Sequence, residues 1–285
     1  MKLPPFDYAS PTSITDAVAL LAAGKGEARL LAGGQSLLPV MAFRLANPAL
    51  LIDMRKIPDL QTIAVDDRGV RLGALVRWCD IANSPALKKA LPLLPNAIEH
   101  VAHYAIQTRG TVGGSLGHAD PAAEFPGLAV TCDAMIEIEG SAGRREMPAN
   151  TLFTGPLQTS LGHDDIIVAI RFPPWPADRK WAFEEFSRRH GDFALAAIAV
   201  FYDLDDSGRI ANAHVGVIAA TDKPTRLPTA EAALNGQMPN SECFIAASEA
   251  AAQACNPSAD IHASADYRRS LVRTLLTRAL RKTLN

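Results

Sequence analysis

The stretch Leu31-Ala32-Gly33-Gly34-Gln35-Ser36-Leu37 carries the strongest structural signal in this 285-residue chain. It joins an apolar segment typical of a buried strand to an apolar segment, residues 37–45, with the spacing of a helix. Paired glycines allow positive φ and leave out the β-carbons that would keep a large anion at a distance. The free amides at the start of the following helix attract the same anion. The stretch therefore predicts a strand, an anion-binding loop and a helix in succession.

A second glycine pair with matching chemistry follows much later, in Thr111-Val112-Gly113-Gly114-Ser115. Each pair has a serine or threonine beside it, whose hydroxyl adds a hydrogen-bond donor to the backbone amides. Two such loops are suited to holding one diphosphate from both sides. The chain contains no G-x-x-x-x-G-K-[ST], and Arg29 stands where Gly24-Lys25-Gly26 would need a third glycine. The expected nucleotide site is therefore neither a P-loop nor a Rossmann site.

The overall composition is that of an ordinary globular protein, with 48% hydrophobic and 20% charged residues. The formal net charge of −2 gives no electrostatic basis for binding nucleic acid or an anionic membrane. The longest apolar run, residues 193–202, is about half of a membrane span, and residues 1–8 lack the apolar core of a signal peptide. We therefore expect no nucleic acid partner, no membrane span and a cytoplasmic location.

Cysteines and two neighbouring histidines are the residues to consider for a metal site. The four cysteines are Cys79, Cys132, Cys243 and Cys255. They lie far apart without a C-x-x-C pair, which disfavours an iron–sulfur cluster or a structural zinc held by this chain alone. His100 and His103 have i, i+3 spacing on a helix expected over residues 96–104, but they lack H-E-x-x-H order. We expect buried thiols, surface or packing histidines, and no metal ligand.

The remaining patterns predict helices and strands in a mixed chain. A first helix is expected to be capped within residues 12–15, to run through residues 17–21 and to stop at Gly24. Further helices are expected over residues 78–83, 96–104, 230–234, 242–254 and 267–284. Strands are expected over residues 28–32, 50–54, 62–65, 70–75, 135–139, 165–170, 181–188, 194–204 and 210–219. The cluster Pro173-Pro174-Trp175-Pro176 marks a domain boundary. The last helix should carry arginines largely outside its apolar stripe, on a solvated face or a partner surface: Arg268, Arg269, Arg273 and Arg278.

Both glycine stretches lie within longer segments that resemble known cofactor motifs. Residues 31–39, with residues 44–48 and 51–53 after them, resemble the first FAD motif of the medium, flavin-binding subunit of molybdenum hydroxylases, the xanthine and carbon monoxide dehydrogenase family. Residues 110–124 resemble the second FAD motif of that family along their whole length. A weaker likeness continues through residues 191–194 to the end of the chain, so the resemblance covers essentially the whole sequence.

This resemblance implies the fold. It is an α+β fold in which two subdomains of the vanillyl-alcohol-oxidase (PCMH) type enclose FAD. A C-terminal domain with a three-stranded antiparallel sheet and a helical bundle follows. We expect residues 1–56 to form the N-terminal α/β FAD subdomain, residues 57–176 the second FAD subdomain, and residues 177–285 the C-terminal domain.

The resemblance also implies the residues that bind FAD. Those that surround the diphosphate, mostly through backbone amides, are Ala32, Gly33, Gly34, Gln35, Ser36 and the adjoining Leu37 in the first loop, and Thr111, Val112, Gly113, Gly114 and Ser115 in the second. Glu124 is implied to accept hydrogen bonds from ribityl or ribose hydroxyls, and the alternative is a helix N-terminal acid that follows a cap at Asp120. Ile167, on the strand expected over residues 165–170, completes the set with His118 and Phe193.

The last two of these residues have open alternatives. His118 lies near the diphosphate or the flavin, or it is a hydrogen-bonded structural histidine. Phe193 stands at an aromatic position that is a tyrosine near the isoalloxazine ring in carbon monoxide dehydrogenase relatives, and the alternative is a core phenylalanine at the start of a strand. Gln107-Thr108 replaces the Arg-Asn of many relatives just before the second loop.

The function that the resemblance implies needs no catalytic side chain, because a flavin carries the redox chemistry and the protein supplies position and electrostatics. The chain would be an oxidoreductase subunit that passes electrons from two [2Fe–2S] clusters of a small iron–sulfur subunit through FAD to an external acceptor. A large molybdopterin subunit would hold the molybdenum cofactor, in a dimer of heterotrimers. The alternatives are a self-sufficient FAD-dependent oxidase and a non-enzymatic nucleotide-binding module.

Overall fold

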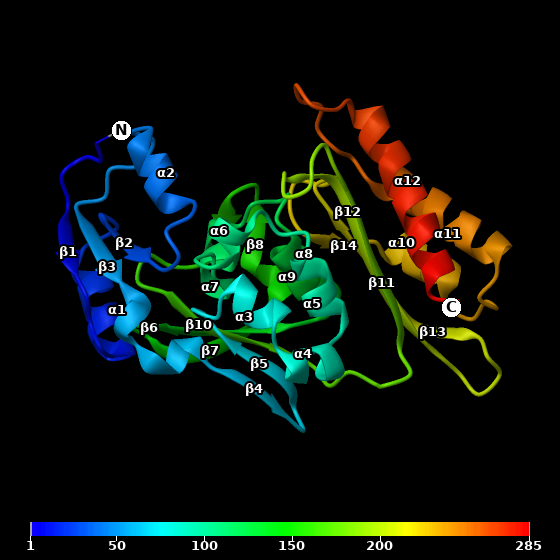
Figure 1. Cartoon of the computed structure of the whole chain (residues 1–285), viewed down its shortest axis with the longest axis horizontal. Coiled ribbons are helices and arrows are strands. Elements are labelled where there is room, and N and C mark those ends of the chain that lie inside the picture. Colours follow the sequence, from blue (N-terminus) through cyan, green and yellow to red (C-terminus); the bar gives the residue numbers. More distant parts are fainter. Residues whose placement is uncertain (1, 285) are drawn as a thin grey trace.

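The chain forms three parts that follow one another in sequence, as the computed structural model of residues 2–284 shows (Figure 1). The first part is a small parallel sheet in the order β1-β3-β2, with two helices. Its elements are β1 (Asp7–Ala9), α1 (Ile14–Ala23), β2 (Ala28–Leu31), α2 (Leu37–Ala42) and β3 (Leu50–Asp53). The Ser13 side chain caps α1 by accepting a hydrogen bond from the Asp16 amide, so the expected helix start is confirmed.

The second part is built on a five-stranded antiparallel sheet in the order β4-β5-β10-β6-β7. Its strands are β4 (Ile63–Asp66), β5 (Gly69–Gly73), β6 (Met135–Gly140), β7 (Gly143–Pro148) and β10 (Ile166–Phe172). Two 3-10 helices, η1 (Met54–Lys56) and η2 (Pro58–Gln61), lead into it, and β8 (Phe153–Gly155) pairs with β9 (Gln158–Thr159). All expected strands of this part are confirmed, and β7 was missed because its side chains are polar and mostly exposed.

Helices of the second part lie over one face of this sheet (Figure 1). They are α3 (Trp78–Ala82), α4 (Pro85–Ala90), α5 (Leu93–Ile98), α6 (Tyr104–Gln107), α7 (Val112–His118), α8 (Glu124–Thr131) and α9 (Ala149–Leu152). The helix expected over residues 96–104 is wrong, because α5 ends at Ile98 and Ala102 adopts a positive φ of 48°. His100 and His103 therefore lie in a connection, and their i, i+3 spacing has no helical meaning.

The third part is an antiparallel sheet covered on one face by three helices (Figure 1). Its elements are β11 (Lys180–Ser187), β12 (Ala194–Leu204), β13 (Ile210–Ile218), β14 (Thr225–Arg226), α10 (Pro228–Leu234), α11 (Ser241–Ala254) and α12 (Ala265–Lys282). The three expected strands are confirmed, and the short β14 pairs with β13, so the sheet has four strands rather than three. The connection between β10 and β11 contains the proline cluster.

One arginine of α12 contradicts the expectation of a solvated face. Arg268 is buried, and its Nη1 donates to the carbonyl oxygens of Leu195 at 2.6 Å and Ala219 at 3.1 Å, while Nη2 bonds Asp260 at 2.7 Å. A buried guanidinium needs such acceptors, and here they tie α12 to strand ends that no sequence pattern links to it. The other arginines expected on that face, Arg273 and Arg278 among them, are at least partly exposed.

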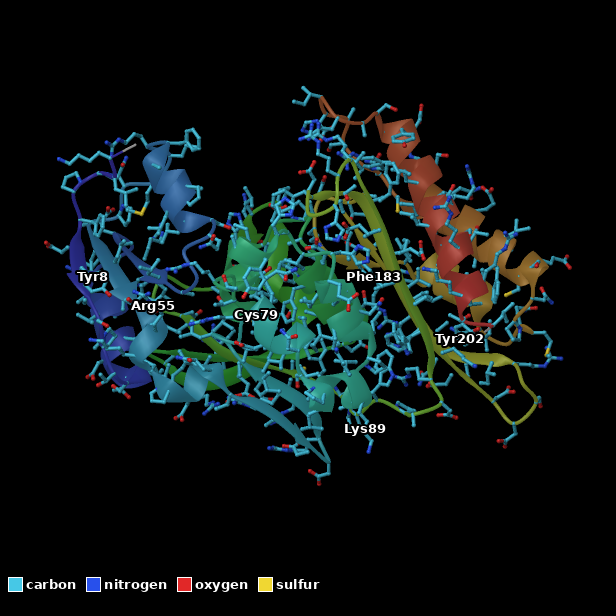
Figure 2. The ribbon with its side chains drawn as sticks, in the orientation of Figure 1. Tyr8, Arg55, Cys79, Lys89, Phe183 and Tyr202 are labelled. Carbon is cyan, nitrogen blue, oxygen red and sulfur yellow. The ribbon has the colours of Figure 1, made fainter. Side chains whose placement is uncertain are left out.

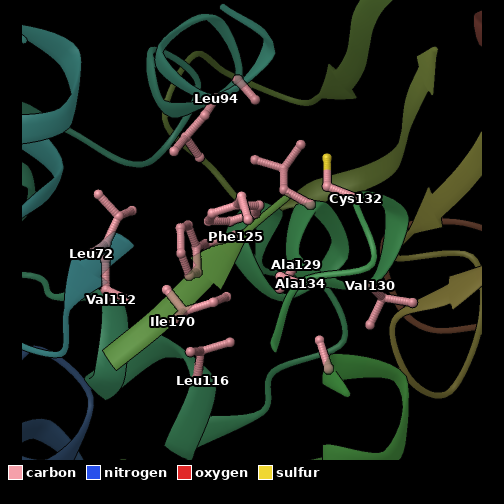
Figure 3. Packing of buried hydrophobic residues seen from close by; sticks show 14 of the residues in the cluster. Leu72, Leu94, Val112, Leu116, Phe125, Ala129, Val130, Cys132, Ala134 and Ile170 are labelled. Carbon is pink, nitrogen blue, oxygen red and sulfur yellow. The ribbon is translucent and has the colours of Figure 1, made fainter. Parts of the chain in front are cut away.

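The core has a central cluster that joins the second and third parts. Alternate residues of β11 and β12, such as Phe183 and Phe201, face the second part, whereas their neighbours, such as Tyr202, face the helices of the third part (Figure 2). Figure 3 shows Phe125 of α8 among apolar side chains of this cluster. The centroid of the Phe125 ring lies 5.2 Å from that of the Trp78 ring and 6.1 Å from that of the Phe172 ring. These contacts hold α8 in place. Within residues 2–284, no helix is both long and apolar enough to cross a bilayer.

Candidate cofactor-binding site

A cavity of about 840 Å³ runs between the first and second parts and reaches the third part at residues 191–193. This volume is in the range of cofactor pockets. Both glycine loops contribute to its wall. Of the residues expected at the cofactor, those that line the cavity are Ala32, Gly33, Gly34, Gln35, Ser36, Leu37, Thr111, Gly113, Gly114, Ser115, His118, Glu124, Ile167 and Phe193. The fold thus brings together residues from all three parts.

The two loops touch each other although they are far apart in the sequence. A β-carbon built at Gly33 would lie 2.1 Å from the carbonyl oxygen of Arg109, just before the second loop. One built at Gly114 would lie 3.8 Å from the β-carbon of Ala32. Gly34 has a φ of 73°, which a residue with a side chain rarely adopts. Glycine is therefore required at Gly33 by close packing and at Gly34 by backbone conformation.

The first loop offers a row of free donors. Among residues 2–284, the amides of Gly33, Gly34, Gln35 and Ser36 have no protein acceptor, and the Gln35 side chain folds back to the Gly33 carbonyl at 3.0 Å. Consecutive unpartnered amides beside a cavity are suited to phosphate oxygens, because their N–H groups can converge on one anion. The expected role of this loop therefore agrees with its geometry.

The second loop differs from the expectation that its amides are free. Val112 donates to the Val76 carbonyl at 3.0 Å, Gly113 to Ala74 at 2.7 Å, and Ser115 to Thr111 at 3.0 Å. The amide of Gly114 bonds the Thr111 hydroxyl at 3.2 Å. These bonds fix the loop against β5 and the chain after it, so the amides are already engaged. The residues of this loop that line the cavity are Thr111, Gly113, Gly114 and Ser115, and the two glycines form a surface without β-carbons.

Val112 is the one expected site residue that does not line the cavity. Its side chain is fully buried in the central cluster, next to Leu116, on the side of α7 that packs on the sheet. The expectation that Val112 contacts the cofactor is therefore corrected. Residues four apart share a helix face, and the face of α7 that holds Val112 and Leu116 lies opposite the one that holds Gly114 and His118, which line the cavity.

Glu124 is the buried acid of the site. It is 5% exposed, lines the cavity and is the first residue of α8, which starts after Ala123 without a side-chain cap. Burial raises its pKa to about 7, and the nearby Asp120 carboxylate adds to this effect. Glu124 is therefore the helix N-terminal acid of the alternative interpretation, and it also lines the cavity. Asp120 is no helix cap, because its Oδ1 accepts from the Ala122 amide at 2.9 Å and closes a turn before the helix.

The remaining expected residues reach the cavity wall from three different segments of the chain. His118, half-buried, ends α7, and Ile167, on β10, is 6% exposed. Phe193 precedes β12 and is 64% exposed, so the interpretation of a core phenylalanine is wrong. The unusual Gln107 has a structural role, because its Nε2 donates to the Val101 carbonyl at 2.9 Å.

Sequence reasoning missed other wall residues. Gly117 lines the cavity, and a β-carbon there would meet nothing within 4 Å. The position of Gly117 within the second FAD motif, residues 110–124, was the signal that could have indicated this. Gly191, with φ of 82°, also lines the cavity, and a β-carbon there would come 2.5 Å from the His103 ring. This contact, which only folding creates, brings the connection between β11 and β12 onto the second part.

Comparison with known proteins agrees with this architecture. Residues 4–175 match the family model of the FAD binding domain in molybdopterin dehydrogenase, and residues 181–283 match that of the CO dehydrogenase flavoprotein C-terminal domain. The fold and cavity are thus those of an FAD-binding protein. The chain belongs to the family of FAD-binding medium subunits of molybdenum hydroxylases such as carbon monoxide dehydrogenase.

Individual relatives match over nearly their whole length. The chain is 44% identical to the nicotine 6-hydroxylase medium subunit of Paenarthrobacter nicotinovorans, over 98% of both chains. It superposes on a chain of the carbon monoxide dehydrogenase from Hydrogenophaga pseudoflava with a TM-score of 0.96 and 36% identity, covering 100% of this chain and 99% of that one. For a chain of quinoline 2-oxidoreductase from Pseudomonas putida 86 the TM-score is 0.94, with 36% identity over 99% and 98% of the chains.

Proposed function

We propose that this chain binds one non-covalent FAD in the cavity and is the electron-transferring subunit of a heterotrimeric molybdenum hydroxylase. The observation that carries the proposal is the row of unpartnered first-loop amides at the wall of a cavity shared by all three parts. The diphosphate would lie against Gly33, Gly34, Gln35 and Ser36, with the hydroxyls of the second loop opposite.

The residues present fit the rest of FAD as well. Glu124, buried beside the cavity without an ion-pair partner among residues 2–284, is suited to the hydroxyls of a ribityl chain or ribose. Apolar side chains such as Ile167 and Leu37 provide surfaces for ring systems, and the exposed Phe193 stands at the end of the cavity on the third part. When bound, FAD supplies redox chemistry, because it can accept single electrons and release pairs. The protein positions it and leaves one end accessible.

The partners follow from the family. Relatives that this chain resembles are named medium subunit or medium chain of nicotine 6-hydroxylase and carbon monoxide dehydrogenase, which supports a small and a large partner chain. In our proposal, two [2Fe–2S] clusters of a small subunit deliver electrons, a large subunit holds the molybdenum cofactor, and an external acceptor takes the electrons from this chain. A dimer of these heterotrimers in the cytoplasm completes the proposal.

Purification of the native complex tests the proposal. The tagged chain is isolated from its own cells, and flavin, iron and molybdenum are measured in the complex that copurifies. We expect FAD, iron in the amount of two [2Fe–2S] clusters, and molybdenum in equal proportion to this chain. FAD with no iron–sulfur or molybdenum subunit would favour a self-sufficient oxidase, and absence of flavin would favour a nucleotide-binding module without redox function.

The bond between flavin and protein is tested on the same sample. Neither glycine loop contains a cysteine, histidine or tyrosine to which a flavin would be attached. Acid precipitation should therefore release the FAD into the supernatant. Yellow colour that stays with the precipitated protein would contradict non-covalent binding.

A further inference from the structure

A second, much smaller cavity lies beside the large one. Its polar wall residues are Arg55, Gln61, Arg77, Thr108, Arg109 and Thr111. Ala32, Gly33 and Thr111 line both cavities, so the two spaces are neighbours. Gln35 and Ser36, whose amides have no acceptor among residues 2–284, line the large cavity alone. The small cavity is therefore distinct from the space proposed for the cofactor.

The size of the small cavity restricts what it can hold. Its volume is about 80 Å³, whereas a single water molecule needs about 10–15 Å³ of such space. Pockets for cofactors and similar ligands have volumes of about 300–1,000 Å³. The cavity therefore admits a group of a few heavy atoms, such as a phosphate, but no nucleotide.

Three arginines reach this cavity from segments that only folding brings together. Arg55 follows β3 in the first part, whereas Arg77 and Arg109 belong to the second part. Arg77 and Thr111 form an isolated antiparallel bridge, so their side chains lie on the same face of the backbone. Arg109 precedes Thr111 by two residues, and its carbonyl oxygen would lie 2.1 Å from a β-carbon built at Gly33. The cavity is thus built where the two parts meet.

The charges around the cavity are unbalanced. No carboxylate within residues 2–284 lines it. Arg55 is neutralised by Asp53, whose carboxylate oxygens accept from its Nε and Nη2 at 2.6–3.0 Å. Arg77 and Arg109 are exposed and take part in no ion pair in the described part of the chain. Asp80 accepts from the backbone amide of Arg77 at 3.1 Å and does not pair with its guanidinium. Two positive charges therefore have no counterion from the protein.

This donor set matches a phosphate dianion. Guanidinium groups gathered at one cavity repel one another, and a bound anion removes that repulsion. Arginine stays charged and binds phosphate through two parallel N–H bonds. The Thr111 hydroxyl accepts from the Gly114 amide at 3.2 Å, which leaves its O–H free to donate. Two uncompensated charges fit a dianion better than a carboxylate, which carries one.

We propose that the small cavity is a phosphate site, separate from the FAD site, in which Arg77 and Arg109 bind a phosphate dianion with Arg55 and Thr111 beside it. The ligand is inorganic phosphate or the phosphate group of a phosphomonoester, whose organic part can extend into solvent past the exposed arginines. The bound anion joins the first part to the second and stabilises the folded chain. This inference goes beyond the proposed function and does not require bound FAD.

Calorimetric titration of the full FAD-free chain with inorganic phosphate tests the site, with sodium chloride holding the ionic strength constant. We expect one phosphate per chain. Arg77→Gln and Arg109→Gln should each weaken phosphate binding by about tenfold, because each removes charged hydrogen bonds to the anion. Arg68→Gln is the matched control and should bind phosphate like wild type, because Arg68 is 72% exposed and lies outside the cavity wall.

Two other ligands define the chemical class. Acetate should bind at least about tenfold more weakly than phosphate, because it carries a single charge. Glycerol phosphate that binds as tightly as inorganic phosphate would identify a phosphomonoester as the ligand, whereas much weaker binding would identify the free anion. Either result supports the site, provided that Arg77→Gln lowers the affinity for the ligand that binds.

Melting temperatures at equal ionic strength give a second readout. Phosphate at ten times its dissociation constant should raise the wild-type melting temperature by about 2–4 °C, and the same concentration should raise that of either variant less. Equal effects of phosphate and acetate on wild type, or wild-type phosphate affinity in both variants, would overturn the inference. Loss of phosphate binding in the FAD-loaded chain would overturn it as well, because the small cavity would then be part of the FAD site.

Discussion

Replacement of Gly33 by alanine separates two loops that the fold presses together. The added β-carbon would lie 2.1 Å from the Arg109 carbonyl oxygen, whereas ordinary contact begins at 3.4 Å, so the loops must move apart by about 1.3 Å. The Arg109 oxygen belongs to the backbone and the backbone fixes the position of the β-carbon, so neither atom can turn away by a side-chain rotation. Overpacking of this kind costs about 1–3 kcal/mol, which we expect as a loss in the free energy of unfolding.

The same displacement should weaken FAD binding. Residues of both loops line one cavity, so a separation of about 1 Å would stretch hydrogen bonds to a shared ligand on one side beyond their range. Loss of a single hydrogen bond to a charged phosphate costs about 1.5–3 kcal/mol, which corresponds to roughly tenfold to hundredfold weaker binding. Urea denaturation of the FAD-free chain measures the stability, and flavin fluorescence titration measures the affinity.

Two other glycines provide controls. Gly127→Ala places a β-carbon 2.2 Å from the Ile218 Cγ1 atom, at the contact of α8 with β13, so stability should fall while FAD affinity stays within about threefold of wild type. Gly117→Ala meets no atom within 4 Å and should stabilise α7 by up to about 1 kcal/mol, while it narrows the cavity. If Gly33→Ala lost stability but bound FAD as tightly as wild type, contact between the loops would not position the phosphate donors.

Three further predictions concern the site and the acid side of the pH range. Glu124→Ala should weaken FAD binding by about 1–3 kcal/mol in fluorescence titrations, and Glu124→Gln should weaken it by less. Unchanged FAD affinity with a lower melting temperature would mean that Glu124 acts only as the N-terminal acid of α8. Gly114→Val should remove nearly all flavin from the purified complex. The β-carbon of the valine would lie 2.8 Å from the capping Thr111 hydroxyl, and its branches would enter the cavity. Full flavin content in this variant would refute the loop assignment. Arginine partners hold the pKa of Asp53 and of Glu137 at about 2, below the values in the unfolded chain. The free energy of unfolding should therefore decline as pH falls from 5 to 3. Equal urea midpoints at the two pH values would contradict this expectation.

Local patterns were sufficient for most of the regular elements. The apolar run that ends at residue 202 predicted β12, and the cap within residues 12–15 predicted the start of α1, because each signal acts between residues close in sequence. The connection around His100 and His103 was misjudged for a local reason as well. Pro92 and Pro95 fit the N-cap and first turn of α5, where no helical hydrogen bond is lost, so the helix begins and ends earlier than the pattern indicated.

Long-range packing decided the roles that local patterns misjudged. Arg268 has the spacing of a surface arginine, yet carbonyl groups from two strand ends surround it in the folded chain. The second glycine loop has the composition of a phosphate loop, but its amides bond residues 74 and 76, which lie far upstream. Hydrogen-bond partners of this kind depend on three-dimensional position, which residue type does not encode locally.

The sequence alone determined the chemistry available at the site: two glycine loops with hydroxyl neighbours, an acid after the second loop, and a resemblance that names the cofactor. Only the tertiary structure decided which groups are free to act. It left the first-loop amides without acceptors, turned Val112 into the core, and buried Glu124 at the wall of the cavity. The physical reason is that burial and pairing arise between segments distant in the chain, and they set both the cost of a charge and the availability of a donor.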